Sequence, residues 1–265
     1  MPRQVTAFSN ATVKRLRSLR DKKGRRTEGL FLAEGLRILT EARDSRRLPE
    51  IVAFSAEGAK HPLAAEIIAA TEAAGGEAIE TTPDILSKMS GKDNPQMLLG
   101  AYRVPDASLG QIDRANAPLW IVAQALRDPG NLGTILRTGD AVGAGGLILI
   151  DDSADPFSVE AVRASMGAIF TQEVATARWP EFLAWLRSGE GQLVGTSLKA
   201  TDDYLEAKYQ KPSFLLIGNE QQGLPADYEA ECDLLVKIPM AGRADSLNAA
   251  MAAAVIAFAI RASWR

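Results

Sequence analysis

The sequence predicts an α/β protein of two domains, the larger of which is built on a mainly parallel sheet. Short apolar segments alternate with segments of helical periodicity along most of the 265 residues, and this alternation favours parallel strands covered by helices on both faces. Hydrophobic residues make up 46% and charged residues 24% of the chain, as is typical of a globular protein. Residues 105–118 contain two prolines, a glycine and several polar residues, a pattern that indicates a linker.

The first domain, residues 1–104, is expected to be a small α/β unit. Its expected strands are 29–33, 51–54 and 77–80. Its expected helices are 34–43, 62–74 and a short helix that starts after Thr82 and ends near Met89. Two features support these limits: Gly75 and Gly76 indicate a helix end, and Thr82 before Pro83 is typical of a helix start.

The second domain, residues 119–265, shows a longer alternation. Strands are expected at 119–123, 147–150, 173–174, 193–196, 214–217 and 234–238. Helices are expected at about 132–142 and at 159–169, 179–187 and 248–261. Because parallel sheets bind ligands beyond the carboxyl ends of their strands, the loops after residues 217 and 238 are candidates for a binding site.

Basic side chains concentrate near the N-terminus, although the net charge is only −3. Residues 1–47 hold 13 Lys or Arg against 5 Asp or Glu. Such a cluster favours contact with the phosphates of a nucleic acid. The alternative is a solvated helix face, because Val13, Leu16 and Leu19 stand at helical spacing among the charges. We favour nucleic acid, since a solvated face mixes the two signs more evenly, and the candidate RNA-binding residues are Lys14, Arg15, Arg17, Arg20, Lys22, Lys23, Arg25 and Arg26.

Several kinds of chemistry are poorly supported by the composition. The chain has one cysteine, Cys232, and one histidine, His61. The single cysteine allows no intramolecular disulfide and no thiolate metal cage, the single histidine gives poor support to a Ser-His-Asp triad, and we expect no metal. The glycine-rich phosphate loops of nucleotide-binding proteins are also missing. A cofactor without phosphates, such as S-adenosylmethionine, needs no such loop. No apolar run has the length of a membrane span, so we expect a cytoplasmic protein.

Three polar junctions at predicted strand or helix ends carry the remaining chemistry. All three lie in the second domain, so they are expected to form one composite site. They are Asn131-Leu132-Gly133 with Arg137, Gly218-Asn219-Glu220 with Gly223-Leu224-Pro225, and Ser246-Leu247-Asn248 before an alanine-rich helix.

These junctions carry a resemblance to a known family. Residues 128–138, DPGNLGTILRT, resemble the first motif of the SpoU/TrmH family of RNA 2'-O-ribose methyltransferases, in the SPOUT superfamily. The second motif is matched by LIGNEQQGL at 216–224, and the third by IPMAG at 238–242 with SLN at 246–248. A further family-like stretch is RASMGA at 163–168. The N-terminal part is similar, less closely, to the substrate-binding domain of many members that act on rRNA.

The resemblance implies a fold and an activity. The second domain would have a trefoil knot and would act as a homodimer whose site is completed by the partner, after an N-terminal domain of the L30e type. The activity would be methyl transfer from S-adenosylmethionine to a ribose 2'-hydroxyl of structured RNA. The favoured substrate is 23S rRNA, and tRNA is the alternative. A catalytically inactive RNA-binding protein of the same fold is a second alternative. A third alternative, a nucleotide-dependent oxidoreductase, is disfavoured because the sequence lacks the phosphate-binding loop that such an enzyme needs.

The resemblance also implies roles for individual residues. Arg137 matches the catalytic arginine, which binds a phosphate beside the target ribose or acts as base. Asn131 orients the ribose or fixes its loop, and Glu220 holds Asn131 or the partner's arginine. Ser246 and Asn248 match the polar pair of the third motif. The residues expected at the cofactor are Gly218, Ile238 and Leu247, with Met240 and, at the end of a strand, Thr196, Ser197 and Leu198.

The third motif departs from the family pattern on both sides. Ala249-Ala250 follow Asn248 where the family commonly has Val-Ser, and the approach to Ser246 through Arg243 and Asp245 is unusually charged. These changes affect details of cofactor binding more than the catalytic pair.

Overall fold

The structure, a computed structural model, describes residues 2–265 and divides them into two compact units. Unit 1 comprises residues up to Pro105 together with 157–171, and unit 2 comprises 106–156 and 172–265. The segment 157–171 was expected in the second domain. It groups with unit 1 because the rings of Phe157 and Phe170 pack on Phe31, with centroids 5.1 and 5.8 Å away.

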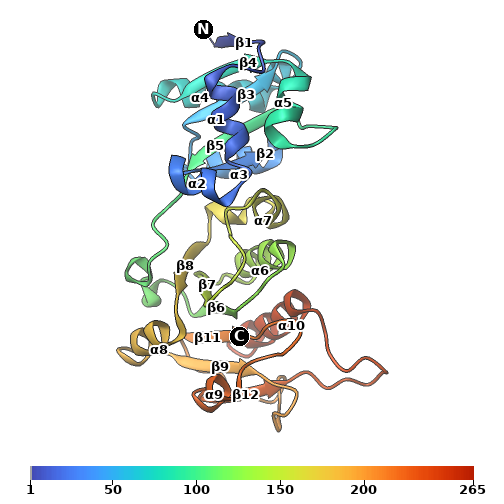
Figure 1. The fold of residues 1–265 in the computed structure, drawn as a ribbon. Coiled ribbons are helices and arrows are strands. Elements are labelled where there is room, and N and C mark those ends of the chain that lie inside the picture. The colour runs from blue at the N-terminus through green and yellow to red at the C-terminus, as the bar shows by residue number, and fades with distance from the viewer. Residues whose placement is uncertain (1) are drawn as a thin grey trace. The chain divides into compact units, whose positions relative to one another are not determined.

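Unit 1 contains a five-stranded sheet in the order β1-β4-β3-β5-β2 (Figure 1). Its strands are β1 (Arg3–Val5), β2 (Leu30–Glu34), β3 (Ile51–Ser55), β4 (Glu77–Thr81) and β5 (Leu98–Arg103). β1, β4 and β3 run parallel, whereas β5 is antiparallel to both of its neighbours, β3 and β2. The sequence did not predict β1 or β5.

The helices of unit 1 cover both faces of this sheet. They are α1 (Ala11–Ser18), α2 (Lys22–Glu28), α3 (Leu36–Asp44), α4 (Pro62–Ala73), α5 (Pro83–Ser90) and α7 (Val159–Ser165). Leu16 of α1 and Met89 of α5 are buried against Leu32 and Ile79 of the sheet. The predicted helix 159–169 was too long: Met166 and Gly167 have positive φ angles of 53° and 105°, which end α7 before a 3-10 turn.

Unit 2 contains a seven-stranded sheet in the order β10-β12-β9-β11-β6-β7-β8, and all of its strand pairs are parallel. This confirms the predicted α/β class with a parallel sheet. The strands are β6 (Leu119–Gln124), β7 (Gly146–Ile150), β8 (Glu173–Ala177), β9 (Gln192–Thr196), β10 (Asp202–Asp203), β11 (Ser213–Ile217) and β12 (Leu234–Lys237).

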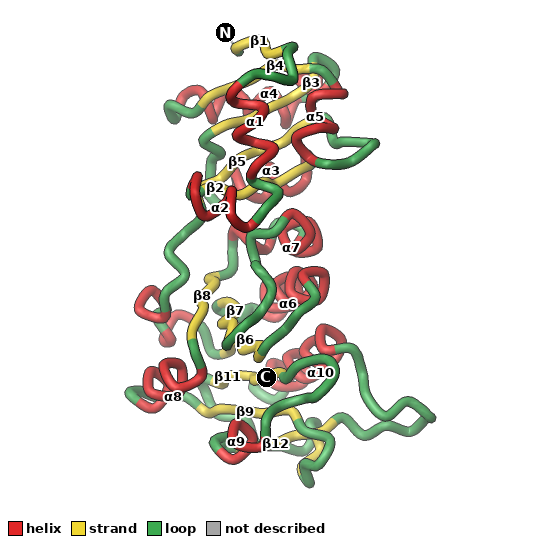
Figure 2. Tube along the Cα trace, in the orientation of Figure 1, coloured by secondary structure: helices red, strands yellow, loops and turns green. Residues whose placement is uncertain are grey.

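Helices lie on both faces of the second sheet (Figure 2). α6 (Pro129–Val142) and α10 (Ala249–Ala262) pack side by side against β6, β7 and β11. α8 (Trp179–Arg187) covers the other face, where Phe182 is buried with Trp120 and Phe214, and α9 (Ala226–Ala230) precedes β12. Within residues 2–265 no helix combines the length and the apolar character needed to cross a bilayer.

Candidate active site

The polar junctions of unit 2 meet at the carboxyl edge of its parallel sheet. β6 and β11 are neighbours in parallel register, and β9 lies between β11 and β12. The loops that follow β6, β11 and β12 therefore leave the sheet at the same edge, which is where parallel sheets bind ligands.

Hydrogen bonds join one residue from each junction into a relay. The Nδ2 of Asn248 donates to the Oδ1 of Asn131 over 3.0 Å, and the Nδ2 of Asn131 donates to the Oε1 of Glu220 over 3.1 Å. The second bond has the geometry expected if Glu220 holds Asn131. The side-chain oxygen of Asn131 thus faces one motif while its NH2 group faces another, which fixes the orientation of the amide.

Helix starts place both asparagines. α6 begins at Pro129, one turn earlier than predicted, and Asp128 caps it by accepting the Asn131 backbone N–H at 2.8 Å. Asn131 is therefore in the first turn, and its side chain is left for the relay. Asn248 caps α10, because its Oδ1 accepts the N–H of Ala250 at 2.9 Å.

Asn219, for which the sequence predicted no role beyond its place in the second junction, ties the first two junctions together. Its Nδ2 donates to the carbonyl oxygen of Ala125 at 2.8 Å, and its Oδ1 accepts the N–H of Gln221 at 2.9 Å. Ala125 has a positive φ of 48°, a conformation in which non-glycine residues are uncommon. The loop is also closely packed, since a Cβ on Gly218 would stand 2.3 Å from the carbonyl carbon of Gly223.

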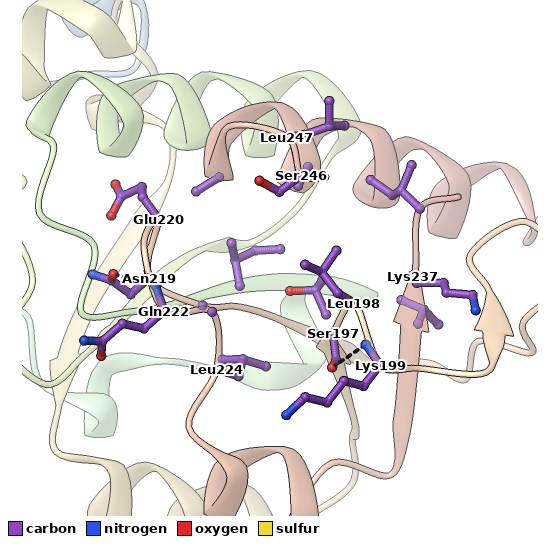
Figure 3. Close-up of a pocket in the computed structure, with 18 of the residues that line it drawn as sticks. Ser197, Leu198, Lys199, Asn219, Glu220, Gln222, Leu224, Lys237, Ser246 and Leu247 are labelled. Atoms are coloured by element: carbon purple, nitrogen blue, oxygen red, sulfur yellow. Dashed lines mark hydrogen bonds between the residues drawn. The ribbon is translucent and has the colours of Figure 1, made fainter. Parts of the chain in front are cut away.

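A cavity of about 360 Å³ opens beside the relay. Figure 3 shows Asn219, Glu220 and Gln222 on one side of it, and Ser246 and Leu247 before α10. Glu220 and Ser246 line this cavity, and so do all seven residues expected at the cofactor: Thr196, Ser197, Leu198, Gly218, Ile238, Met240 and Leu247. Their contact with the cofactor stays a prediction.

The cavity wall suits S-adenosylmethionine. Its volume lies in the range of about 300–1,000 Å³ typical of small-molecule sites. Leu224, Val236 and Ile256 provide apolar surface for a heteroaromatic ring, whereas Ser197 and Lys199 provide polar groups for an amino-acid end. The sequence reasoning missed the contribution of α10, although Ala249, Ala252 and Ile256 have the spacing of one helix face.

Arg137 lies apart from this cavity within one chain. It is exposed on α6, six residues beyond Asn131, and lines neither this cavity nor a second one formed at the same sheet edge by the loops after β6 and β11. Within residues 2–265 its side chain makes no hydrogen bond and no ion pair. An arginine available on the surface can act on a substrate or a site outside its own chain.

The basic segment is more ordered than a loose arm. Val13, Leu16 and Leu19 are buried, as expected for one face of a helix. Arg25 is only 5% exposed, and its Nη1 donates to the carbonyl oxygens of Leu19 at 2.9 Å and Arg20 at 2.8 Å. This burial does not favour contact between Arg25 and a phosphate, and its assignment to RNA binding stays a prediction.

The other candidate RNA-binding residues are differently placed. Arg15 is half-buried and paired with Glu28, Nε to Oε2, over 2.6 Å. The exposed cations of α1, α2 and their junction are Lys14, Arg17, Arg20, Lys22, Lys23 and Arg26.

No group of three or more His, Cys, Asp or Glu side chains in the described part of the chain is arranged to hold a metal ion. Burial, with the charges of Asp233 and Glu229, raises the pKa of the Cys232 thiol to about 12.

Two family models match the chain. The SpoU rRNA Methylase family matches residues 118–258, and the MRM3-like substrate binding domain matches residues 10–100. The first match covers all three motifs and the relay. The second covers the basic helices and most of the first sheet.

Individual proteins are similar over almost the whole chain. The 23S rRNA (guanosine(2553)-2'-O)-methyltransferase RlmP of Bacillus subtilis is 30% identical, over 98% of this chain and 99% of its own length. The 23S rRNA (uridine(2479)-2'-O)-methyltransferase of Streptomyces viridochromogenes is also 30% identical, over 97% and 91%. The solved structure of an AdoMet-bound rRNA methyltransferase from Sinorhizobium meliloti is 38% identical, with a TM-score of 0.91 over 99% of this chain and 98% of that one.

Proposed function

Because the chain belongs to the SpoU rRNA methylase family, we propose that it transfers a methyl group from S-adenosylmethionine to a ribose 2'-hydroxyl of 23S rRNA. Relatives that span nearly its full length carry this activity in their names, and a solved neighbour binds the cofactor. The observation that carries the proposal is the relay of Asn248, Asn131 and Glu220 beside a cavity that suits the cofactor.

The residues of the chain align the acceptor hydroxyl. The cofactor, when bound, supplies a methyl group on a positively charged sulfur. The hydroxyl is a weak acid, so the protein has to orient it and remove its proton. The Asn131 amide, fixed on both sides, can orient the ribose. Glu220 uses only Oε1 in the relay, which leaves Oε2 to accept a hydrogen bond from the ribose or from an arginine.

Arg137 has two candidate roles. A guanidinium keeps its charge at neutral pH, which suits it to binding the phosphate beside the target ribose. Acting as the base requires a strongly perturbed environment. In both roles we assign the arginine to a second copy of the chain, an assignment supported by its absence from the walls of both cavities within one chain.

A homodimer is therefore part of the proposal. Met251, Val255 and Phe258 of α10 are 59%, 36% and 52% exposed and stand on one face of the helix. An exposed apolar stripe of this kind is typical of a surface that another molecule covers. α6, which carries Arg137, packs beside α10, so a second copy seated on the stripe would bring the arginine close to the shared surface.

Family membership supports three further assignments. The end of unit 2 would form a trefoil knot, an exception to the usual absence of threaded chains. Unit 1 would bind the RNA, with the exposed cations of α1 and α2 in contact with phosphates. A protein that modifies rRNA would act in the cytoplasm.

The experiment that tests the proposal maps 2'-O-methylated positions in total RNA from cells with and without this protein. We expect one position of 23S rRNA to lose its methyl group when the protein is absent. If the two maps agree and calorimetry detects no S-adenosylmethionine binding to the folded protein, the assignment as an enzyme is wrong.

A further inference from the structure

A second cavity, of about 730 Å³, lies at the same edge of the sheet. It shares the loop 219–224 with the first cavity, and its remaining wall comes from the end of β6 and the start of α6. Asn131 and Glu220 of the relay line it, together with Gln124 and Arg127. Eight of its twelve lining residues carry polar or charged side chains.

Gln124 is the unusual member of this wall. It is the last residue of β6 and, by strand alternation, follows Trp120 and Val122 on the face that packs against α8. The residue is only 8% exposed, and within residues 2–265 its side-chain amide bonds to no other residue yet is not among the fully buried unpaired polar groups, so the amide opens into the cavity. An amide that opens into a cavity can hydrogen-bond to water or to a ligand held there. A partner outside the chain explains why this side chain is polar.

The position of Gln124 defines the partner. A ribose whose 2'-hydroxyl meets the relay at Asn131 and Glu220 has to place its base nearby, and the second cavity shares both residues. An amide offers an acceptor beside donors, which complements the paired donor and acceptor at the edge of a nucleobase. RNA-binding proteins read unstacked bases in this way. Arg127, which is exposed in the same wall, can bind a phosphate.

We propose that the second cavity holds the nucleobase of the target nucleotide, that the Gln124 amide hydrogen-bonds to the edge of that base, and that Arg127 binds a neighbouring phosphate. This inference rests on the proposed function, since it requires RNA whose ribose is methylated at the relay. It adds a base-recognition site to an enzyme whose relay contacts only the ribose.

Gln124→Met is the informative variant, because methionine is close to glutamine in size and removes the amide. The structure provides a matched control: Gln111 is exposed and lines neither cavity, so Gln111→Met makes the same chemical change elsewhere in unit 2. Both proteins are compared with the unchanged full chain by melting temperature and by calorimetric affinity for S-adenosylmethionine.

The measurement is the kcat/KM for methylation of four rRNA transcripts that differ only in the base at the mapped position. We expect Gln124→Met to lower kcat/KM on the natural base about tenfold or more and to reduce the preference among the four bases to about twofold, as for loss of a base-edge contact. Cofactor affinity should change by less than about twofold, because the amide lies in the second cavity. Gln111→Met should match the unchanged protein.

The outcomes separate the two proposals. If the unchanged protein methylates the transcript and Gln124→Met keeps its rate and base preference, the base site is wrong and the proposed function stands. If the unchanged protein methylates no ribose, both fail. If Gln124→Met melts early, Gln124→Glu, which keeps the size and loses the donors, decides instead. Natural base preference in a folded Gln124→Glu protein would overturn the base site.

Discussion

Asn131 and Asn248 stand 117 positions apart, yet the side-chain amide of Asn248 donates a 3.0 Å hydrogen bond to the side-chain oxygen of Asn131. The same Asn248 caps α10 through its own oxygen. The start of the last helix and the first turn of α6 are thereby held at a fixed separation. Asn131 passes this constraint on to Glu220, so displacement of any one side chain disturbs the other two.

Asn131→Ala should reduce methyl transfer more than it reduces cofactor binding. The variant removes both bonds of the relay and leaves Glu220 unconstrained, while the first cavity keeps its wall. We expect kcat to fall about 10²-fold, as for loss of a substrate-positioning group, and the calorimetric Kd for S-adenosylmethionine to stay within about threefold. Asn116→Ala, at an exposed asparagine elsewhere in unit 2, is the control. A Kd that rises as much as kcat falls would place Asn131 at the cofactor instead.

Arg137→Ala should abolish methyl transfer, and mixing it with a second inactive variant in the same dimer should restore part of the activity. In Gly218→Val the added side chain collides with Gly223 in the cofactor loop, so this protein should be inactive for a different reason. If Arg137 acts across the dimer, a heterodimer holds one site with both an intact cavity and an arginine. Co-refolding the two variants should restore about a quarter of the activity, because half of the dimers are mixed and each has one good site. A mixture as inactive as its components would assign Arg137 to its own chain.

Phe258→Glu should convert the dimer to a monomer. The substitution places a charge in the exposed stripe of α10, where burial against a second copy would require the carboxylate to lose water. Phe8 is a matched control, since it is 55% exposed against 52% for Phe258 but lies in unit 1. Sedimentation at micromolar concentration should show a monomer for Phe258→Glu and the parental mass for Phe8→Glu. Equal masses for all three proteins would remove the stripe from the interface.

Local sequence signals predicted the elements that are governed by local interactions. The helix 179–187 was predicted at both ends, and Asn248 was placed at the start of the last helix. The strand 98–103 was missed because its residues are buried on both faces and Gly100 interrupts the apolar run, so no alternation marks it. The grouping of Phe157 and Phe170 with Phe31 depends on ring contacts between distant segments, which periodicity does not report.

In the candidate site, too, the sequence identified residues but not the contacts between them. Motifs identified Asn131, Glu220 and Asn248, but only the fold shows that their side chains bond to one another. Arg25 was grouped with its basic neighbours because charge alone does not reveal which cation is buried. Gln124 carried no signal at all, since a glutamine that ends an apolar strand resembles the start of a loop.

Cys232 should be slow to react in the folded protein. Burial, then the charges of Asp233 and Glu229, raise its pKa to about 12, against about 8.5 in an unfolded chain. The raised pKa means that the fold favours the neutral thiol over the thiolate. The contribution of this preference to the free energy of unfolding is fully present below about pH 8.5 and is lost as the pH rises toward 12. Iodoacetamide at pH 8.5 should label the native protein at least about 100-fold more slowly than the protein in guanidinium. Similar rates in both would mean that the thiol is accessible.

Neutralising exposed cations of α1 and α2 should weaken RNA binding and its dependence on salt. We choose Lys14, Arg17, Lys22 and Lys23, each to glutamine, and leave the buried Arg25 unchanged because its loss would disturb the fold. If all four side chains contact phosphates, the plot of the logarithm of the RNA-binding constant against the logarithm of the salt concentration should become less steep. The magnitude of its slope should decrease by about 3, at roughly 0.7–0.9 per contact. Cofactor affinity should not change, because the cofactor cavity is lined by residues of unit 2.

A charge-matched control separates a binding surface from an effect of net charge. Four exposed cations elsewhere in unit 1 are suitable for the same change to glutamine: Arg46, Arg47, Lys60 and Lys88. Both quadruple variants carry the same net charge, so long-range attraction to RNA is reduced equally in the two proteins. Only loss of direct phosphate contacts makes the slopes differ. If the control flattens the slope as much as the α1 and α2 variant does, these two helices are a solvated surface and the phosphate contacts lie elsewhere.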